Sequence, residues 1–192
     1  MSAIHDHALH SIRTIREAME RATAFTSIPG WGGVAIGLTA LATTAIAAPF
    51  VTRPRLWAIT WIADALVAVV IAAITMHRKA RRAKVSLAGV AARRFFVAYS
   101  APLIAAAIIT VVLVQLDVYA PLPAVWLLLY GASFISSGSF SIRVVPMMGM
   151  LFMLFGVAAC FVPLAIANLV MGIAFGGLHI VFGYIIARSY GG

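Results

Sequence analysis

Residues 56–84 read LWAITWIADALVAVVIAAITMHRKARRAK, and this stretch decides the fold class. Its first 21 residues, 56–76, carry a single charged side chain, that of Asp64. They are long enough to cross the hydrocarbon core of a bilayer, which takes about 20 apolar residues in a helix. The next eight residues carry five lysines and arginines. An apolar run that ends in a basic cluster is typical of a membrane helix that emerges on the cytoplasmic side.

The rest of the chain extends the same pattern. Of its 192 residues, 64% are hydrophobic and 10% are charged, with a mean hydropathy of +1.07. A soluble domain has about 25% charged residues, so this composition excludes a water-exposed enzyme domain for most of the chain. We predict an all-α integral membrane protein with one domain, residues 33–192, that holds six transmembrane helices. The spans are predicted at residues 33–50, 56–76, 95–116, 123–140, 144–161 and 164–187.

The distribution of cations predicts the orientation. With the N-terminus in the cytoplasm, twelve of the fourteen lysines and arginines lie inside and only Arg53 and Arg55 lie outside. Because cytoplasmic loops carry an excess of cations, both termini are predicted to be cytoplasmic, and the membrane to be a bacterial inner membrane. The basic loop, residues 78–94, is expected to contact anionic headgroups. It has no interleaved aromatic residues for base stacking, so the net charge of +9 does not indicate a nucleic-acid partner.

The segment before the first span, residues 1–32, has a helical period of its own. Its apolar residues recur at steps of three and four, with charged residues on the other face. The apolar positions are Leu9, Ile12, Ile15, Met19, Ala22 and Phe25. We predict an amphipathic helix that lies on the cytoplasmic leaflet. A docking helix for a soluble partner is the alternative.

Glycines mark the predicted packing faces of the spans. Lipid gives one helix no hydrophobic drive to meet another, so small residues that let backbones approach closely become the informative signal. They are Gly33 and Gly37 in the first span, Gly149 and Gly156 in the fifth, and Gly172, Gly176 and Gly183 in the sixth, where His179 shares the predicted stripe. These faces serve either the monomer or contacts in a homo-oligomer or larger membrane complex, and the sequence leaves both open.

Two titratable side chains lie well inside predicted spans, Asp64 and His179. A charge in the membrane is costly, so an ionisable residue there is by default a candidate ion or proton site. Each residue also has a purely structural interpretation. Asp64 can be a neutral carboxyl that donates a hydrogen bond between helices, and His179 can be a packed, hydrogen-bonded histidine. Both enter from the outer side, so we also weigh a titrating pair.

Few other sequence motifs indicate a chemical function. The terminal cluster of His5, Asp6, His7 and His10 matches no established metal-site spacing, and no cofactor motif occurs, so neither a metal nor a cofactor is predicted. The single cysteine, Cys160, excludes a disulfide framework and is expected to be a small buried apolar residue.

One resemblance concerns the fourth and sixth spans. Six spans with both ends inside, Gly131-Ala132-Ser133 in one span and His179 to Gly183 in the other, are similar to the rhomboid intramembrane proteases. This resemblance implies Ser133 as nucleophile and His179 as its base. The sequence departs from that family at Phe134, where a glycine is expected, and in the second span, which has no histidine or asparagine for an oxyanion site.

Three classes of function follow from these features. The leading prediction is a non-catalytic membrane subunit or scaffold that associates through glycine-rich helix faces, because small residues outnumber polar ones inside the spans. The alternative is a small proton- or cation-linked transporter or channel protomer that uses Asp64, with His179 as a second candidate. The remote alternative is a rhomboid-like intramembrane serine hydrolase.

Overall fold

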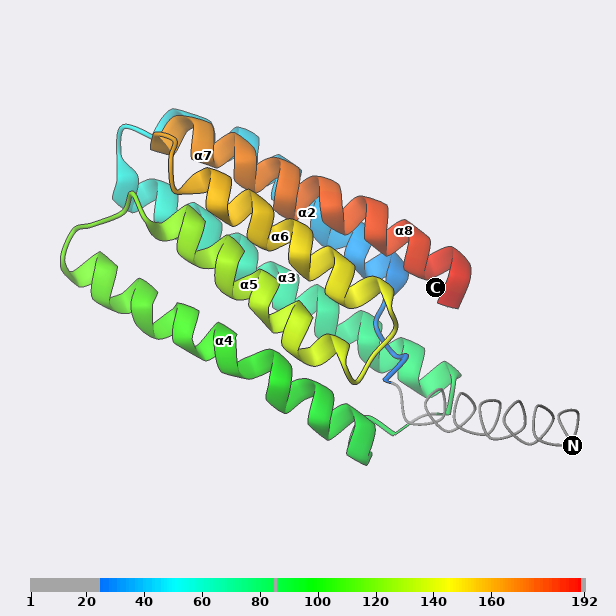
Figure 1. Ribbon diagram of the computed structural model, residues 1–192. Coiled ribbons are helices and arrows are strands. Elements are labelled where there is room, and N and C mark those ends of the chain that lie inside the picture. Colours follow the sequence, from blue (N-terminus) through cyan, green and yellow to red (C-terminus); the bar gives the residue numbers. More distant parts are fainter. Residues whose placement is uncertain (1–24, 85, 191–192) are drawn as a thin grey trace, which may run out of the picture.

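The structure is a computed structural model that describes residues 25–84 and 86–190. Within these ranges the chain is all-α, and its one β-type pairing is an isolated bridge between Phe25 and Ser141. The elements are α2 (Gly30–Ala47), a 3-10 turn η1 (Ala48–Phe50), α3 (Pro54–Arg82), α4 (Val90–Gln115), α5 (Leu122–Gly138), α6 (Val144–Ala159), α7 (Leu164–Met171), a π-helical turn η2 (Gly172–Leu178) and α8 (His179–Tyr190). The last three form one continuous helix, so the bundle consists of six rods that run back and forth side by side (Figure 1).

Four of the rods are long and apolar enough to cross a membrane: Gly30–Phe50, Pro54–Arg82, Val90–Gln115 and Leu164–Tyr190. The prediction of an all-α integral membrane protein is therefore confirmed. α5 and α6 are apolar but shorter, with 17 and 16 residues. At 1.5 Å per residue they reach about 25 Å, slightly less than the bilayer core. Full crossing by these two helices stays a prediction.

Local chemistry explains where several helices begin and end. Pro54 occupies the first turn of α3, where its missing N–H costs nothing. α3 and α4 are each followed by a residue in the left-handed region, Lys84 with φ 53° and Asp117 with φ 55°, which is a common way for a helix to end. These two turns separate α3 from α4 and α4 from α5.

Close backbone contacts hold the bundle together at two places. α2 runs antiparallel to α7–η2–α8, and α5 and α6 form a hairpin (Figure 1). In the hairpin Gly131 and Gly149 face each other, and a Cβ placed on either would lie 2.6–2.7 Å from the carbonyl oxygen of the other. The two backbones can approach this closely because glycine has no side chain at either position.

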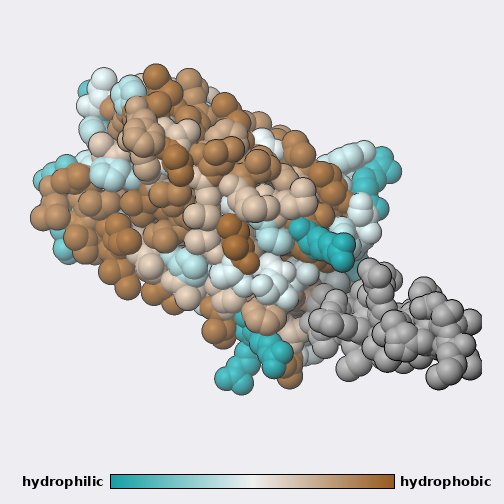
Figure 2. Space-filling model, viewed as in Figure 1, coloured by the Kyte–Doolittle hydropathy of each residue, from teal (hydrophilic) through white to brown (hydrophobic). Residues whose placement is uncertain are grey.

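The charged side chains gather at the ends of the rods. We call the end where α2 begins and α3 ends the basic end. It carries nine of the eleven lysines and arginines among the described residues: Arg78, Lys79, Arg81, Arg82, Lys84, Arg93, Arg94, Arg143 and Arg188. Arg53 and Arg55 lie at the opposite end with Asp117. Figure 2 shows apolar side chains over most of the visible face between these ends.

A short segment, residues 25–29, crosses the basic end before α2 begins. Phe25 donates its N–H to the carbonyl of Phe140 at 2.7 Å, and its ring lies 4.7 Å from that of Phe95. Lys79 holds the other end of the segment by donating from Nζ to the carbonyl of Ile28 at 2.9 Å. Phe25 is thus buried between α4 and the α5–α6 turn and is not helical. The remainder of the predicted amphipathic helix, with His5, Asp6, His7 and His10, lies outside the described residues.

Candidate functional site

Asp64 lies in the first half of α3, about 15 Å from the start of the helix at 1.5 Å per residue. Its carboxyl group lies near the side-chain hydroxyls of Thr39 and Thr43 on α2, and it is only partly buried. Thr39 Oγ1 already donates its proton to the carbonyl of Ile36 at 2.8 Å. These two hydroxyl groups place the carboxyl group of Asp64 beside α2.

His179 begins α8 and is 5% exposed. Its Nδ1 lies 2.8 Å from the carbonyl oxygen of Phe175, and its Nε2 lies 2.9 Å from the hydroxyl of Tyr130 on α5. Because a carbonyl only accepts, Nδ1 carries the proton, and the Nε2 of a neutral ring accepts from Tyr130. Both ring nitrogens are therefore satisfied inside the bundle.

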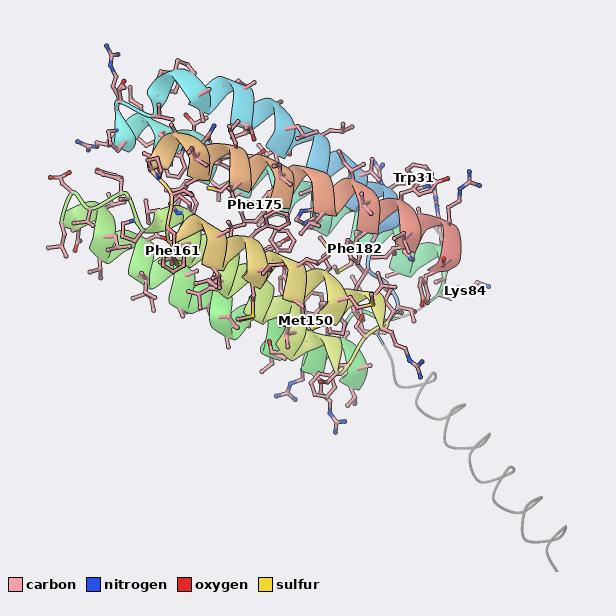
Figure 3. The ribbon with its side chains drawn as sticks, turned by 45° about the horizontal axis from the view of Figure 1, so that its top comes forward. Trp31, Lys84, Met150, Phe161, Phe175 and Phe182 are labelled. Atoms are coloured by element: carbon pink, nitrogen blue, oxygen red, sulfur yellow. The ribbon has the colours of Figure 1, made fainter. Side chains whose placement is uncertain are left out.

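Aromatic rings surround this histidine. The nearest ring centroids lie 5.4–6.4 Å away and belong to Phe152, Tyr130, Phe175 and Phe134. Figure 3 shows Phe175 pointing between the helices. Phe175 and the glycines beside it belong to η2, and such π-helical turns are frequent at functional sites. The environment of His179 is buried and apolar apart from its two hydrogen bonds.

The structure does not bring Asp64 and His179 together. Among the described residues, Asp64 lies near two threonines of α2, whereas His179 is hydrogen-bonded from α5 and by Phe175 of η2. The predicted stripe of glycines and His179 is also wrong in part. Gly176 and Gly183 contact α2, while the side chain of His179 is directed to α5 and α6. The π-helical turn changes the helical register just before His179, which an ideal α-helical period does not anticipate.

Sequence reasoning missed the most highly connected polar group, Asn168 on α7. It is 1% exposed, and its Oδ1 accepts from the indole nitrogens of both Trp57 and Trp61 at 2.9 Å. Its Nδ2 donates to the carbonyl of Thr44 at 3.0 Å. One side chain thus joins α7 to α3 and α2. The available signals were an asparagine inside an apolar run and two tryptophans four residues apart, on one face of a helix.

The tryptophan contacts continue to α5 and α4. The ring of Trp126 on α5 stacks on Trp57 at 5.7 Å with an interplanar angle of 9°. Its Nε1 donates to Thr110 Oγ1 on α4 at 2.8 Å. Hydrogen bonds and this ring stacking therefore link five helices in the half of the bundle away from the basic end. Within it the donors and acceptors are paired, which is typical of a structural network.

All seven glycines predicted at packing faces contact other parts of the same chain. A Cβ on Gly33 would lie 3.2 Å from Gly183, and one on Gly37 would lie 2.6 Å from the carbonyl oxygen of Gly176. The remaining contacts join Gly172 to Thr44, Gly176 to Leu41, Gly183 to Val34, Gly149 to Gly131 and Gly156 to Leu128. Of the two uses that the sequence left open, the structure occupies these faces within the monomer, so they are not free for a second copy.

The residues singled out by the protease resemblance make separate contacts. Ser133 is buried and donates to the carbonyl of Leu129 at 2.9 Å, and His179 is bonded to Tyr130. No hydrogen bond joins Ser133 to His179 in this part of the chain. Cys160, expected to be buried, is exposed just after α6, because this helix ends there and leaves the thiol at the end of the bundle opposite the basic end.

Within residues 25–84 and 86–190, no three histidine, cysteine or acidic side chains lie close enough to hold a metal ion. Comparison of the chain with family models, with curated proteins and with solved structures gives no match.

Proposed function

We propose that this protein is a non-catalytic membrane subunit that docks a partner's membrane helix against the α2–α3 surface at Asp64. The coarse part of this description, a small helical membrane protein, rests on its four long apolar helices. The finer part rests on one observation: Asp64 is an ionisable side chain inside a span that remains partly exposed. The glycine faces are occupied within the monomer, so the association predicted from the sequence needs another surface.

The other polar groups of the interior support this choice by contrast. His179 and Asn168 are buried and fully engaged within the chain. Asp64 has two hydroxyl neighbours on α2, but part of its surface is open to whatever lies beside α3. A carboxyl group in contact with hydrocarbon is unfavourable, so a polar partner at this point would stabilise the complex.

Charge complementarity favours a partner helix with a lysine or arginine at the matching depth. In the described residues, every lysine and arginine lies near the ends of the rods, so a second copy offers no cation at the level of Asp64. Two apposed copies would instead bring two carboxyl groups together without a cation, and two ionised carboxyl groups repel each other. A basic partner would take up the carboxyl proton and form an ion pair that neither helix would make alone.

A synthetic helix tests this proposal directly. The purified protein, labelled with a donor fluorophore at its native exposed Cys160, would be reconstituted in neutral phosphatidylcholine bilayers. Energy transfer would then be measured to two acceptor-labelled polyleucine helices, one with a central lysine and one without. Interhelical hydrogen bonds in model peptides contribute about 1–2 kcal/mol, which corresponds to about 5–30-fold tighter association of the lysine helix.

Asp64→Asn should remove this preference, because asparagine keeps the size of the side chain but cannot carry the negative charge. Asp117→Asn, in the loop after α4, is the matched control and should retain it. Equal association of the two helices, or a preference that survives in Asp64→Asn, would overturn the proposal. Proton or cation uptake into protein-containing liposomes that depends on Asp64 would overturn it too, in favour of transport.

A further inference from the structure

Three side chains from α2 and α8 meet at the surface of the basic end: Trp31, Tyr184 and Arg188. Trp31 is 56% exposed and Tyr184 is 46% exposed, and their rings make an edge contact at 6.3 Å. Figure 3 shows Trp31 beside the end of α8, at the same end of the bundle as Lys84. Aromatic rings in this position are typical of the headgroup level of a membrane.

The guanidinium group of Arg188 is held in place by Tyr184. Its Nε donates to the tyrosine hydroxyl at 3.2 Å, and its Cζ lies 5.4 Å from the centre of the same ring. Among the described residues, this hydrogen bond involves the Nε of Arg188 only. The terminal nitrogens of a guanidinium are suited to binding phosphate oxygens in a bidentate manner.

The first turn of α2 adds positive potential at the same place. Gly30 packs directly on Ala187, the residue before Arg188, so the first turn of α2 contacts α8. No side chain caps the N-terminus of α2, and this turn contains no acidic residue. The positive end of the helix dipole therefore lies next to the arginine. Among the described residues no carboxylate lies at this end of the bundle to offset these charges.

Below the arginine, α8 presents an apolar track toward the middle of the membrane. Four exposed residues follow one another on α8 at steps of three, one and three: Val181, Tyr184, Ile185 and Arg188. Cation, aromatic ring and aliphatic side chains thus occur in the order in which a phospholipid presents its phosphate, glycerol backbone and acyl chain.

We propose that Trp31, Tyr184 and Arg188 form a binding site for one anionic phospholipid, whose phosphate lies against Arg188 and the first turn of α2. The acyl chain lies along Val181 and Ile185. The exposed apolar track favours a lipid over free phosphate, because inorganic phosphate would leave that track without a ligand. This site is separate from the basic loop 78–94, where the sequence predicts diffuse contact with headgroups, and it does not depend on the docking surface at Asp64.

Native mass spectrometry of the purified full chain in detergent tests the site. Dioleoylphosphatidylglycerol and dioleoylphosphatidylcholine would be titrated separately, and the fraction of protein with one bound lipid measured. We expect phosphatidylglycerol to bind at least fivefold more tightly than phosphatidylcholine. Arg188→Gln should abolish this difference, and Tyr184→Phe, which removes only the hydroxyl that orients Arg188, should reduce it about twofold or more.

Arg55→Gln, an exposed arginine at the opposite end, is the matched control and should leave lipid binding unchanged. Inorganic phosphate at millimolar concentration should not displace the lipid. Equal loss in Arg188→Gln and Arg55→Gln would reduce the effect to net charge and overturn the site. Displacement by inorganic phosphate would overturn the lipid as its ligand.

Discussion

Replacing Asn168 by leucine tests whether its side chain is the central link of the interior. The substitution removes all three of its hydrogen bonds at once, two from tryptophan indoles at 2.9 Å and one to the carbonyl of Thr44 at 3.0 Å. Leucine has the same branching and the same number of side-chain heavy atoms as asparagine, so the shape of the side chain changes little. The free energy of unfolding should fall, because the indole N–H groups of Trp57 and Trp61 then lose their acceptor inside the membrane.

The number and strength of these bonds give the expected magnitude. Interhelical hydrogen bonds measured in a membrane protein average about 0.6 kcal/mol and reach about 1.7 kcal/mol at most. Three such bonds give a loss of about 2 kcal/mol, with an upper bound of about 5 kcal/mol. Leu169→Ala, on the neighbouring lipid-facing residue of the same helix, is the control and should change stability by less than about 0.5 kcal/mol.

Unfolding in mixed micelles with increasing dodecyl sulfate, followed by tryptophan fluorescence, measures both variants. Three of the four tryptophans belong to this network and report its loss directly. A double-mutant cycle with Trp61→Phe separates the bond from other effects, since the tryptophan substitution should cost less once Asn168 is gone. An Asn168→Leu protein as stable as the wild type, or a cycle without coupling, would refute the role assigned to Asn168.

Two further predictions concern packing and orientation. Gly37→Ala should destabilise the protein by about 1–3 kcal/mol, because its new Cβ meets a backbone oxygen at 2.6 Å. Gly176→Ala should cost less in the same titration, since it meets mainly the flexible side chain of Leu41; equal costs would contradict this geometry. The native Cys160 should react with an impermeant maleimide only from outside the cell, and a cysteine at Ser86, in a protein with Cys160 replaced by serine, only from the cytoplasm. Labelling of Ser86→Cys from outside would reverse the orientation.

The positions and lengths of the helices were largely predictable from the sequence. The ends of the helices agree with the predicted spans to within a few residues at most ends, because apolar length and turn residues act locally; the larger difference is in α3, which continues through the basic cluster to Arg82. The pairing of interior polar groups was not predictable. Asp64 and His179 were the natural pair by chemistry, but their partners are set by helix packing and, for His179, by a π-helical turn. The role of Asn168 was not predicted because its amide does not titrate. With three hydrogen bonds, however, this amide joins more helices than Asp64 or His179 does.

The pairing of α2 with α7–η2–α8 has a consequence for how the chain is made. The two partners are the first and last of the described membrane helices, so the glycines of α2 enter the membrane long before the glycines that cover them. About 130 residues separate Ala47 from His179, which a ribosome adds in about 7–26 s at its usual rate. During that time the glycine face of α2 lacks the helix of its own chain that packs against it. Insertion of α8 then completes the bundle. If synthesis stops before α8 is made, the glycine face of α2 stays exposed to the proteases and insertion machinery of the membrane.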